Sequence, residues 1–113
     1  MTLVFGLLAA TAAIGVTMAW RHLRRQPVPL PAAVAHGAFA VTGFLTFTVI
    51  LVVGVGITPM AVLAYAAMLV AGILGVVLIT WHLSGDGRHP TALVAAHAAL
   101  GLLVVLLLVA AVR

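Results

Sequence analysis

Four long apolar runs dominate the sequence and constrain what the chain can fold into. They span roughly residues 3–20, 30–55, 59–81 and 91–112, and none contains a charged side chain. Each run reaches or exceeds the ~18 residues that a helix needs to cross a bilayer. Because backbone groups in lipid must bond internally, we expect four helices and no strands. The sequence therefore predicts an all-α integral membrane protein, a single four-transmembrane-helix bundle.

The scarcity of charge supports the same fold class. Charged residues make up 5% of the chain and the mean hydropathy is +1.42, whereas a soluble domain carries about 25% charged residues. Six charged side chains cannot build a water-exposed surface. The net charge of +4 is explained by membrane topology, so no nucleic-acid partner is expected. The absence of cysteine excludes disulfides, thiolate metal sites and iron–sulfur clusters.

The arginines predict an orientation in the membrane. Arg21, Arg24 and Arg25 lie in the first polar break and Arg88 lies in the third, whereas Arg113 stands alone at the opposite side. The positive-inside rule places both basic loops in the cytoplasm and both termini outside. An excess of Ala, Val and Gly, with Arg as the only basic residue besides His, favours a bacterial cytoplasmic (inner) membrane.

Two stretches of the chain share an unusual spacing. "WRHLRRQPVPLPAAVAH" (20–36) and "WHLSGDGRHPTALVAAH" (81–97) both begin with Trp, end with His and place Pro nine residues after the Trp. The offset between them is 61 residues. It predicts two tandem helical hairpins, about 1–56 and 57–113, related by an axis along the membrane normal.

The repeat places one histidine in each of two parallel helices. His36 and His97 both follow a proline by seven residues, so both are expected roughly 10 Å inside the membrane, at 1.5 Å per residue. A lone histidine bonded to a helix carbonyl would be a structural contact. Ionisable groups inside membranes are functional by default, and two at one depth favour a shared ligand.

The residue types nearby narrow the choice of ligand. No carboxylate lies in any helix, which argues against a proton relay, and zinc needs three or four ligands. Haem iron takes two axial ligands from opposite sides, and bundle cores are common cofactor sites. The sequence therefore predicts one b-type haem with His36 and His97 as its metal ligands, and no catalytic residue.

Further residues are candidates for contact with the haem. Gly37, Ala40 and Gly101 would let the porphyrin approach the helices, although small residues also serve helix packing in lipid. Basic side chains near the cytoplasmic face would pair with the propionates, although topology alone explains their place. They are Arg21, Arg25, Arg88 and His82. Quinone is a second candidate ligand, with His82 near its head group.

Four helices with histidine on the second and fourth resemble small membrane b-type cytochromes of the cytochrome b561-like kind. The resemblance covers most of the chain and depends on His36 and on His97 in "HAALG". His36 has Ala40 where His97 has Gly101. The resemblance implies electron transfer in the membrane, often with quinol. Members of this kind often carry two haems on four ligands, whereas this sequence offers one clear pair.

Three functions remain open from the sequence. The first is a one-electron carrier, a small subunit of a larger respiratory or photosynthetic complex that needs a redox partner. The second is a structural or assembly subunit without cofactor, contacting other membrane-protein subunits and lipid. The third is a small transporter, which the absence of any membrane-embedded Glu disfavours. In the first two the chain is a carrier or an accessory subunit and not itself an enzyme.

Overall fold

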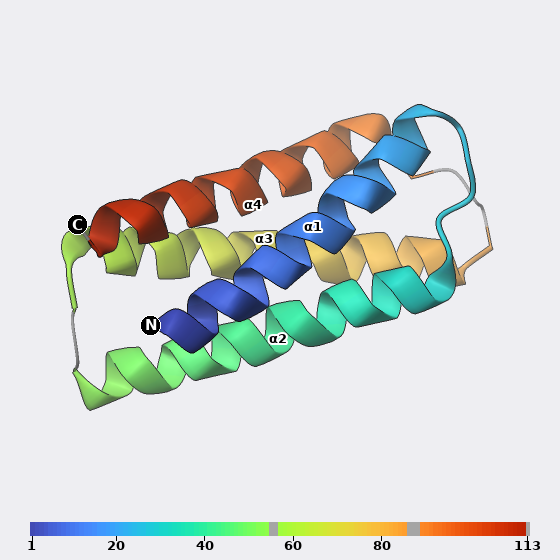
Figure 1. Ribbon diagram of the computed structural model, residues 1–113. Helices are drawn as coiled ribbons and strands as arrows, with labels where there is room; N and C mark the ends of the chain where they lie inside the picture. Colours follow the sequence, from blue (N-terminus) through green and yellow to red (C-terminus); the bar gives the residue numbers. More distant parts are fainter. Residues whose placement is uncertain (55–56, 86–88, 113) are drawn as a thin grey trace.

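The protein folds into four helices. The structure, a computed structural model, describes residues 1–54, 57–85 and 89–112. The helices are α1 (Thr2–Leu23), α2 (Leu30–Val53), α3 (Pro59–Leu83) and α4 (Thr91–Ala111), shown in Figure 1. No strand occurs in these described ranges. The expected all-helical fold is confirmed, and each helix end lies within three residues of its expected position.

Local sequence explains where several helices start and stop. Thr58 precedes α3 and its Oγ1 accepts a hydrogen bond from the Ala61 N–H at 3.1 Å, as a helix N-cap does. Pro59 then occupies the first turn, where no N–H is needed. α2 ends at Gly54, whose φ of 79° is the left-handed conformation that glycine adopts without strain.

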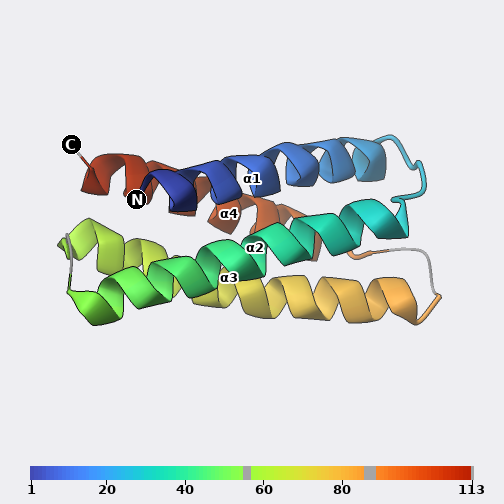
Figure 2. The same cartoon turned by 60° about the horizontal axis from the view of Figure 1, so that its bottom comes forward.

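The helices pair as two hairpins. α1 packs mainly on α2, and α3 packs mainly on α4, whereas the contacts of α1 with α4 and of α2 with α3 are much less extensive. No Cα of α2 comes within 8 Å of one of α4, so these two helices are diagonal in the bundle. The start of α1 and the end of α4 lie at one end, and the α1–α2 connection lies at the other (Figures 1 and 2).

The shape and surface of the bundle suit a bilayer. Its extents are 43 × 20 × 19 Å, so its long axis exceeds the ~30 Å of hydrocarbon in a membrane. All four helices are long and apolar enough to cross it. Large apolar side chains such as Val52, Ile73 and Leu102 point outward. No polar side chain in the described ranges is buried, so the outer surface is compatible with lipid contact.

The fully buried residues all lie in one half of the bundle, which we call the packed half. This half comprises the starts of α1 and α3 and the ends of α2 and α4. Its buried residues are Val4, Leu8, Gly43, Phe47, Ala61, Ala64, Met68, Val104 and Leu108. The other half, which we call the histidine half, contains all five histidines and no buried residue in its described part.

The two hairpins bury corresponding positions. The corresponding buried pairs are Val4 and Ala64, Leu8 and Met68, Gly43 and Val104, and Phe47 and Leu108. The offset is 60 residues between α1 and α3 but 61 between α2 and α4. The difference arises because six residues join α1 to α2 and seven join α3 to α4. Trp20 therefore corresponds to Thr80, and Trp81 lies one position further along.

A candidate bis-histidine site

His36 and His97 meet across the centre of the bundle. Each is the seventh residue of its helix, which places both about 9 Å from the helix start. Their ring centroids are 5.9 Å apart and the ring planes are inclined by 68°. Both rings are partly buried. Two helices that do not touch through their backbones thus bring their imidazoles together.

Each of these imidazoles is held by the helix that precedes it. His36 Nδ1 lies 2.9 Å from the carbonyl oxygen of Thr11 on α1, and His97 Nδ1 lies 2.9 Å from that of Ala71 on α3. A carbonyl oxygen only accepts, so each Nδ1 carries the proton and donates. In a neutral imidazole the lone pair is then on Nε2. Both rings are therefore fixed in the tautomer that leaves Nε2 able to bind a metal.

Two glycines make these hydrogen bonds possible. Gly15 and Gly75 each follow the accepting residue by one helical turn. Side chains on a helix tilt toward its N-terminus, so a Cβ at either position would project over that carbonyl. A Cβ on Gly15 would lie 2.9 Å from His36 Cε1, and a Cβ on Gly75 would lie 3.3 Å from His97 Cε1. The glycines leave the space that the imidazole rings occupy.

Sequence reasoning missed these two glycines. A signal for them exists, because Gly15 and Gly75 are 60 residues apart and the His-Leu pairs at 22–23 and 82–83 are separated by the same distance. The offset of 61, which relates Pro29 to Pro90 and His36 to His97, hid this second offset of 60. The helices that carry these histidines, α2 and α4, are related by 61 residues, whereas the helices that carry the glycines, α1 and α3, are related by 60.

The small residues chosen from the sequence border open space. A Cβ on Gly37 or Gly101 would meet nothing within 4 Å, chain neighbours aside. Gly101 is exposed, and Gly37 and Ala40 are partly buried. Their contact with a haem stays a prediction.

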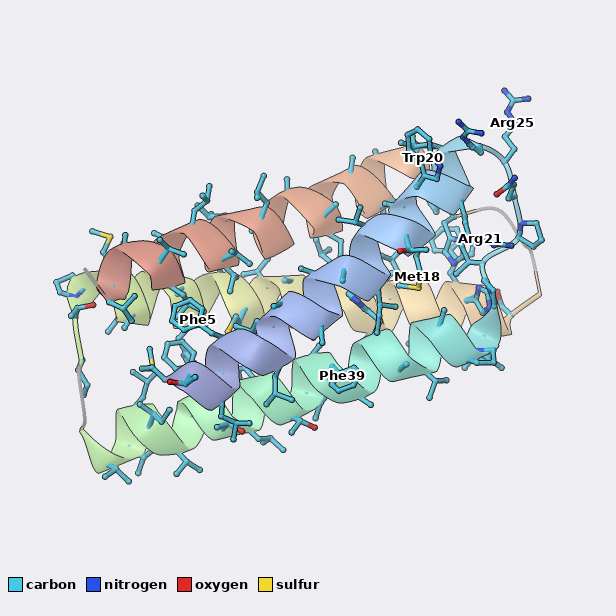
Figure 3. The ribbon with its side chains drawn as sticks, viewed as in Figure 1. Phe5, Met18, Trp20, Arg21, Arg25 and Phe39 are labelled. Carbon is cyan, nitrogen blue, oxygen red and sulfur yellow. The ribbon has the colours of Figure 1, made fainter. Side chains whose placement is uncertain are left out.

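The predicted basic residues gather at the end of the histidine half. Figure 3 shows Arg21 and Arg25 there beside Trp20, far from Phe5 at the other end. Arg21 Nε donates to the carbonyl oxygen of Pro27 at 2.9 Å. Arg25 is exposed and has a φ of 55°. Arg88 lies outside the described residues.

His82 belongs to a second group of imidazoles at this end. Its ring stacks on that of His89 at 5.4 Å, and His22 meets His89 edge-on at 6.1 Å. Burial, followed by the nearby His82 and His22, lowers the pKa of His89 below its ordinary value. The sequence placed these three residues at separate helix ends; the bundle brings them together because α1 and α3 end at the same level.

The arrangement of His36 and His97 suits one metal with two axial ligands. Within the described ranges no group of three His, Cys, Asp or Glu side chains is placed to hold a metal ion. Two imidazoles that bind one metal from opposite sides have ring centres about 6.3 Å apart, given metal–nitrogen bonds of about 2.0–2.1 Å. The observed ring-centre separation of 5.9 Å is close to that value, so the two imidazoles could serve as a pair of axial ligands for one metal.

Comparisons with protein-family models, with curated proteins and with solved structures found no match to this chain.

Proposed function

We propose that the protein binds one b-type haem through Nε2 of His36 and of His97 and carries electrons within the membrane. The observation that carries this proposal is the meeting of the two rings at 5.9 Å, with each Nδ1 bonded to a helix carbonyl. The haem would supply a one-electron couple; the chain supplies its ligands and its surroundings.

The hydrogen bonds to Nδ1 are those that metal-binding histidines need. A histidine ligand usually donates its other ring N–H to a carbonyl or carboxylate, which fixes the ring and raises its basicity as a ligand. The Thr11 and Ala71 carbonyls take this part for His36 and His97. Both are backbone groups of rigid helices, so the orientation does not depend on a mobile side chain.

The partial exposure of the histidine half supports cofactor binding there. No described residue in this half is buried, whereas the fully buried residues lie in the other half. A flat macrocycle held by α2 and α4 would add buried contacts in the half whose described residues are all partly exposed.

A cofactor-free accessory subunit accounts for less of this geometry. A structural histidine needs only its carbonyl contact, and one histidine on either helix would satisfy it. A purely structural role does not explain why two rings from diagonal helices meet. It also does not explain why neither Nε2 atom has a hydrogen-bond partner among the described residues. The described residues form four helices and short connections, with no separate domain among them that could donate or accept electrons. We therefore propose that electrons pass to or from another subunit or a quinol.

We also propose an orientation of the bundle in the membrane. Arg21, Arg24 and Arg25 lie at the end of the bundle opposite the start of α1 and the end of α4. The positive-inside rule assigns that end to the cytoplasm, in a bacterial inner membrane.

An absorption spectrum of the full chain tests the haem directly. We expect a Soret band and the sharp reduced α-band of six-coordinate low-spin iron after expression with ample haem supply. His36→Ala and His97→Ala should each abolish the low-spin spectrum to a similar degree, because either imidazole alone leaves one axial position open.

Thr42→Val is a matched control on α2. The Thr42 hydroxyl donates to the Ala38 carbonyl oxygen of its own helix at 2.8 Å, so its loss should leave the spectrum unchanged. A folded, fully assembled sample without a Soret band would contradict the proposal and favour a cofactor-free subunit. A normal low-spin spectrum in His36→Ala would show that the ligands are other residues.

A further inference from the structure

Two cavities open at the end of the histidine half and share one residue, His22. The first is a polar cleft of about 230 Å³, lined by His22, His82, His89 and Gln26 among others. The second is an apolar groove of about 150 Å³ between the end of α1 and the start of α4. A cleft lined by imidazole and amide groups beside an apolar groove suits an amphiphile.

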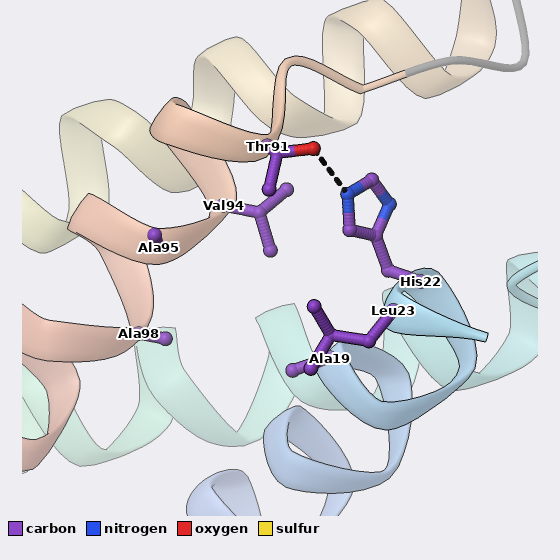
Figure 4. A pocket seen from close by; sticks show the side chains of 7 residues that line it. All are labelled: Ala19, His22, Leu23, Thr91, Val94, Ala95 and Ala98. Atoms are coloured by element: carbon purple, nitrogen blue, oxygen red, sulfur yellow. Dashed lines mark hydrogen bonds between the residues drawn. The ribbon is translucent and has the colours of Figure 1, made fainter. Parts of the chain in front are cut away.

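Figure 4 shows how the groove is built. Ala19 and Leu23 of α1 form one side, and Val94, Ala95 and Ala98 of α4 form the other. His22 closes its polar end, with Nε2 at 3.5 Å from the hydroxyl of Thr91. Alanine on both helices leaves a channel on the outer face of the bundle, where Ala95 and Ala98 are exposed.

The charged side chains that the structure describes at this end of the bundle are all basic. Arg21, Arg24 and Arg25 lie at the same end of α1 as His22, and they are the charged side chains that the structure describes. Asp86, the single acidic residue of the chain, lies outside the described residues. Imidazole and guanidinium groups donate hydrogen bonds to phosphate and pair with its charge. A phosphate group is thus the complementary polar end.

We propose that this end of the bundle binds one anionic glycerophospholipid. Its phosphate lies against His22 at the mouth of the cleft, and one acyl chain lies in the groove between α1 and α4. Basic pockets between transmembrane helices on the cytoplasmic side select anionic lipids in this way. The site does not involve His36 or His97, so it does not depend on haem binding.

The corresponding place on the other side of the bundle is lined by different residues. Ile79 of α3 corresponds to Ala19, and Val34 of α2 corresponds to Ala95. These two replacements are larger than alanine. The proposed lipid site is therefore the groove at α1 and α4.

Native mass spectrometry of the full chain tests this. The protein in mild detergent is mixed with phosphatidylglycerol or with phosphatidylcholine of identical acyl chains, and the retained lipids are counted. We expect one phosphatidylglycerol per chain, with a preference over phosphatidylcholine of about fivefold, which corresponds to the roughly 1 kcal/mol that one basic side chain contributes. Equal retention of the two lipids would overturn the proposal.

Two variants separate the groove from the cleft. Ala95→Leu fills the groove and should abolish retention, whereas Ala96→Leu, on an exposed neighbouring position that does not line the groove, should leave it unchanged. His22→Gln keeps the size of the side chain and should lower the preference for the anionic lipid, since one of the groups facing its phosphate is lost. Unchanged retention in Ala95→Leu, checked by circular dichroism to be helical, would contradict the site, as would an unchanged preference in His22→Gln.

Discussion

The two halves of the bundle are made of the same four helices but differ in what they bury. In the packed half Val4, Phe47 and Ala64 are wholly inaccessible, and Tyr65 stacks on Phe44 with ring centroids 5.1 Å apart. In the histidine half every described residue is at least partly exposed, and both cavities lie there. Lipid is as apolar as leucine, so close packing holds the helices together. The packed half therefore contains the buried core that stabilises the bundle, and the histidine half contains the site at which we propose binding.

The largest test of this contrast is Phe47→Ala. The Phe47 ring is fully buried and meets Tyr65 edge-on at 6.0 Å. We expect a loss of about 3 kcal/mol in the free energy of unfolding, the lower end of the range for buried aromatic residues, because a cavity replaces the ring. Unfolding in mixed micelles of increasing denaturing detergent, followed by circular dichroism, measures the change.

The control for Phe47→Ala is Phe39→Ala on the same helix. Phe39 is 39% exposed, so its removal should cost much less. If stability resides in the packed half, haem content per folded chain should be unaffected by either substitution. Equal losses of stability from both variants would show that the two halves contribute alike.

Gly15→Ala should have the next largest effect, and it acts in the histidine half. Its Cβ would lie 2.9 Å from His36 Cε1, closer than carbon atoms approach, so the ring must move away from the Thr11 carbonyl. We expect overpacking to cost about 1–2 kcal/mol and the spectrum of the bound haem to change. The matched variant Gly75→Ala, with a contact of 3.3 Å to His97, should show the same changes more weakly.

Gly101→Ala is the reference for both glycine variants. A Cβ there meets nothing within 4 Å, so the gain of about 0.5–1 kcal/mol from replacing glycine in a helix should appear undiminished. Redox titration and unfolding of the three variants, measured side by side, would separate the effect of the contact with the imidazole from the effect of replacing glycine on helix propensity. If Gly15→Ala behaves like Gly101→Ala, the His36 ring does not occupy the place described.

The smallest expected effect is a pH dependence centred on His89. Burial lowers the pKa of His89, and His82 on α3 and His22 on α1 act in the same direction. The neutral form is therefore favoured in the fold. The corresponding stability is fully present above the ordinary pKa of about 6.5 and is lost as the pH falls through the lowered pKa.

The measurement compares wild type with His89→Gln between pH 7.5 and pH 5. The wild type should lose stability on acidification by more than the variant does, since glutamine does not titrate. Identical pH profiles would mean that burial does not lower the pKa of His89 in the fold.

The sequence was sufficient for the helices and for the depth of the two central histidines. Apolar runs without charge can form only helices in lipid, and Pro29 and Pro90 fix where α2 and α4 begin, so His36 and His97 fall on the seventh residue of each. These features depend on local chemistry and on spacing along one helix, which the sequence contains directly.

The supporting residues were not predictable in the same way. Gly15 and Gly75 lie against the imidazoles because of the axial register of α1 on α2 and of α3 on α4. That register is set by packing between the two helices of each hairpin. Gly37 and Gly101 are closer to the histidines in sequence, yet a Cβ on either would meet nothing within 4 Å, chain neighbours aside. The group formed by His22, His82 and His89 likewise depends on α1 and α3, which do not contact each other, ending at the same end of the bundle.

The hydrogen bonds of His36 and His97 also divide the site between the hairpins. His36 donates to α1 and His97 to α3, so each imidazole is oriented entirely within its own hairpin. The entropic cost of ordering each ligand is then met before the hairpins join. Because the contacts between the two hairpins are few, a cofactor bound by both would link them. If the proposed cofactor binds there, its capture would add to the packed core in joining the hairpins, so cofactor supply would raise the share of the chain that exists as a closed four-helix unit.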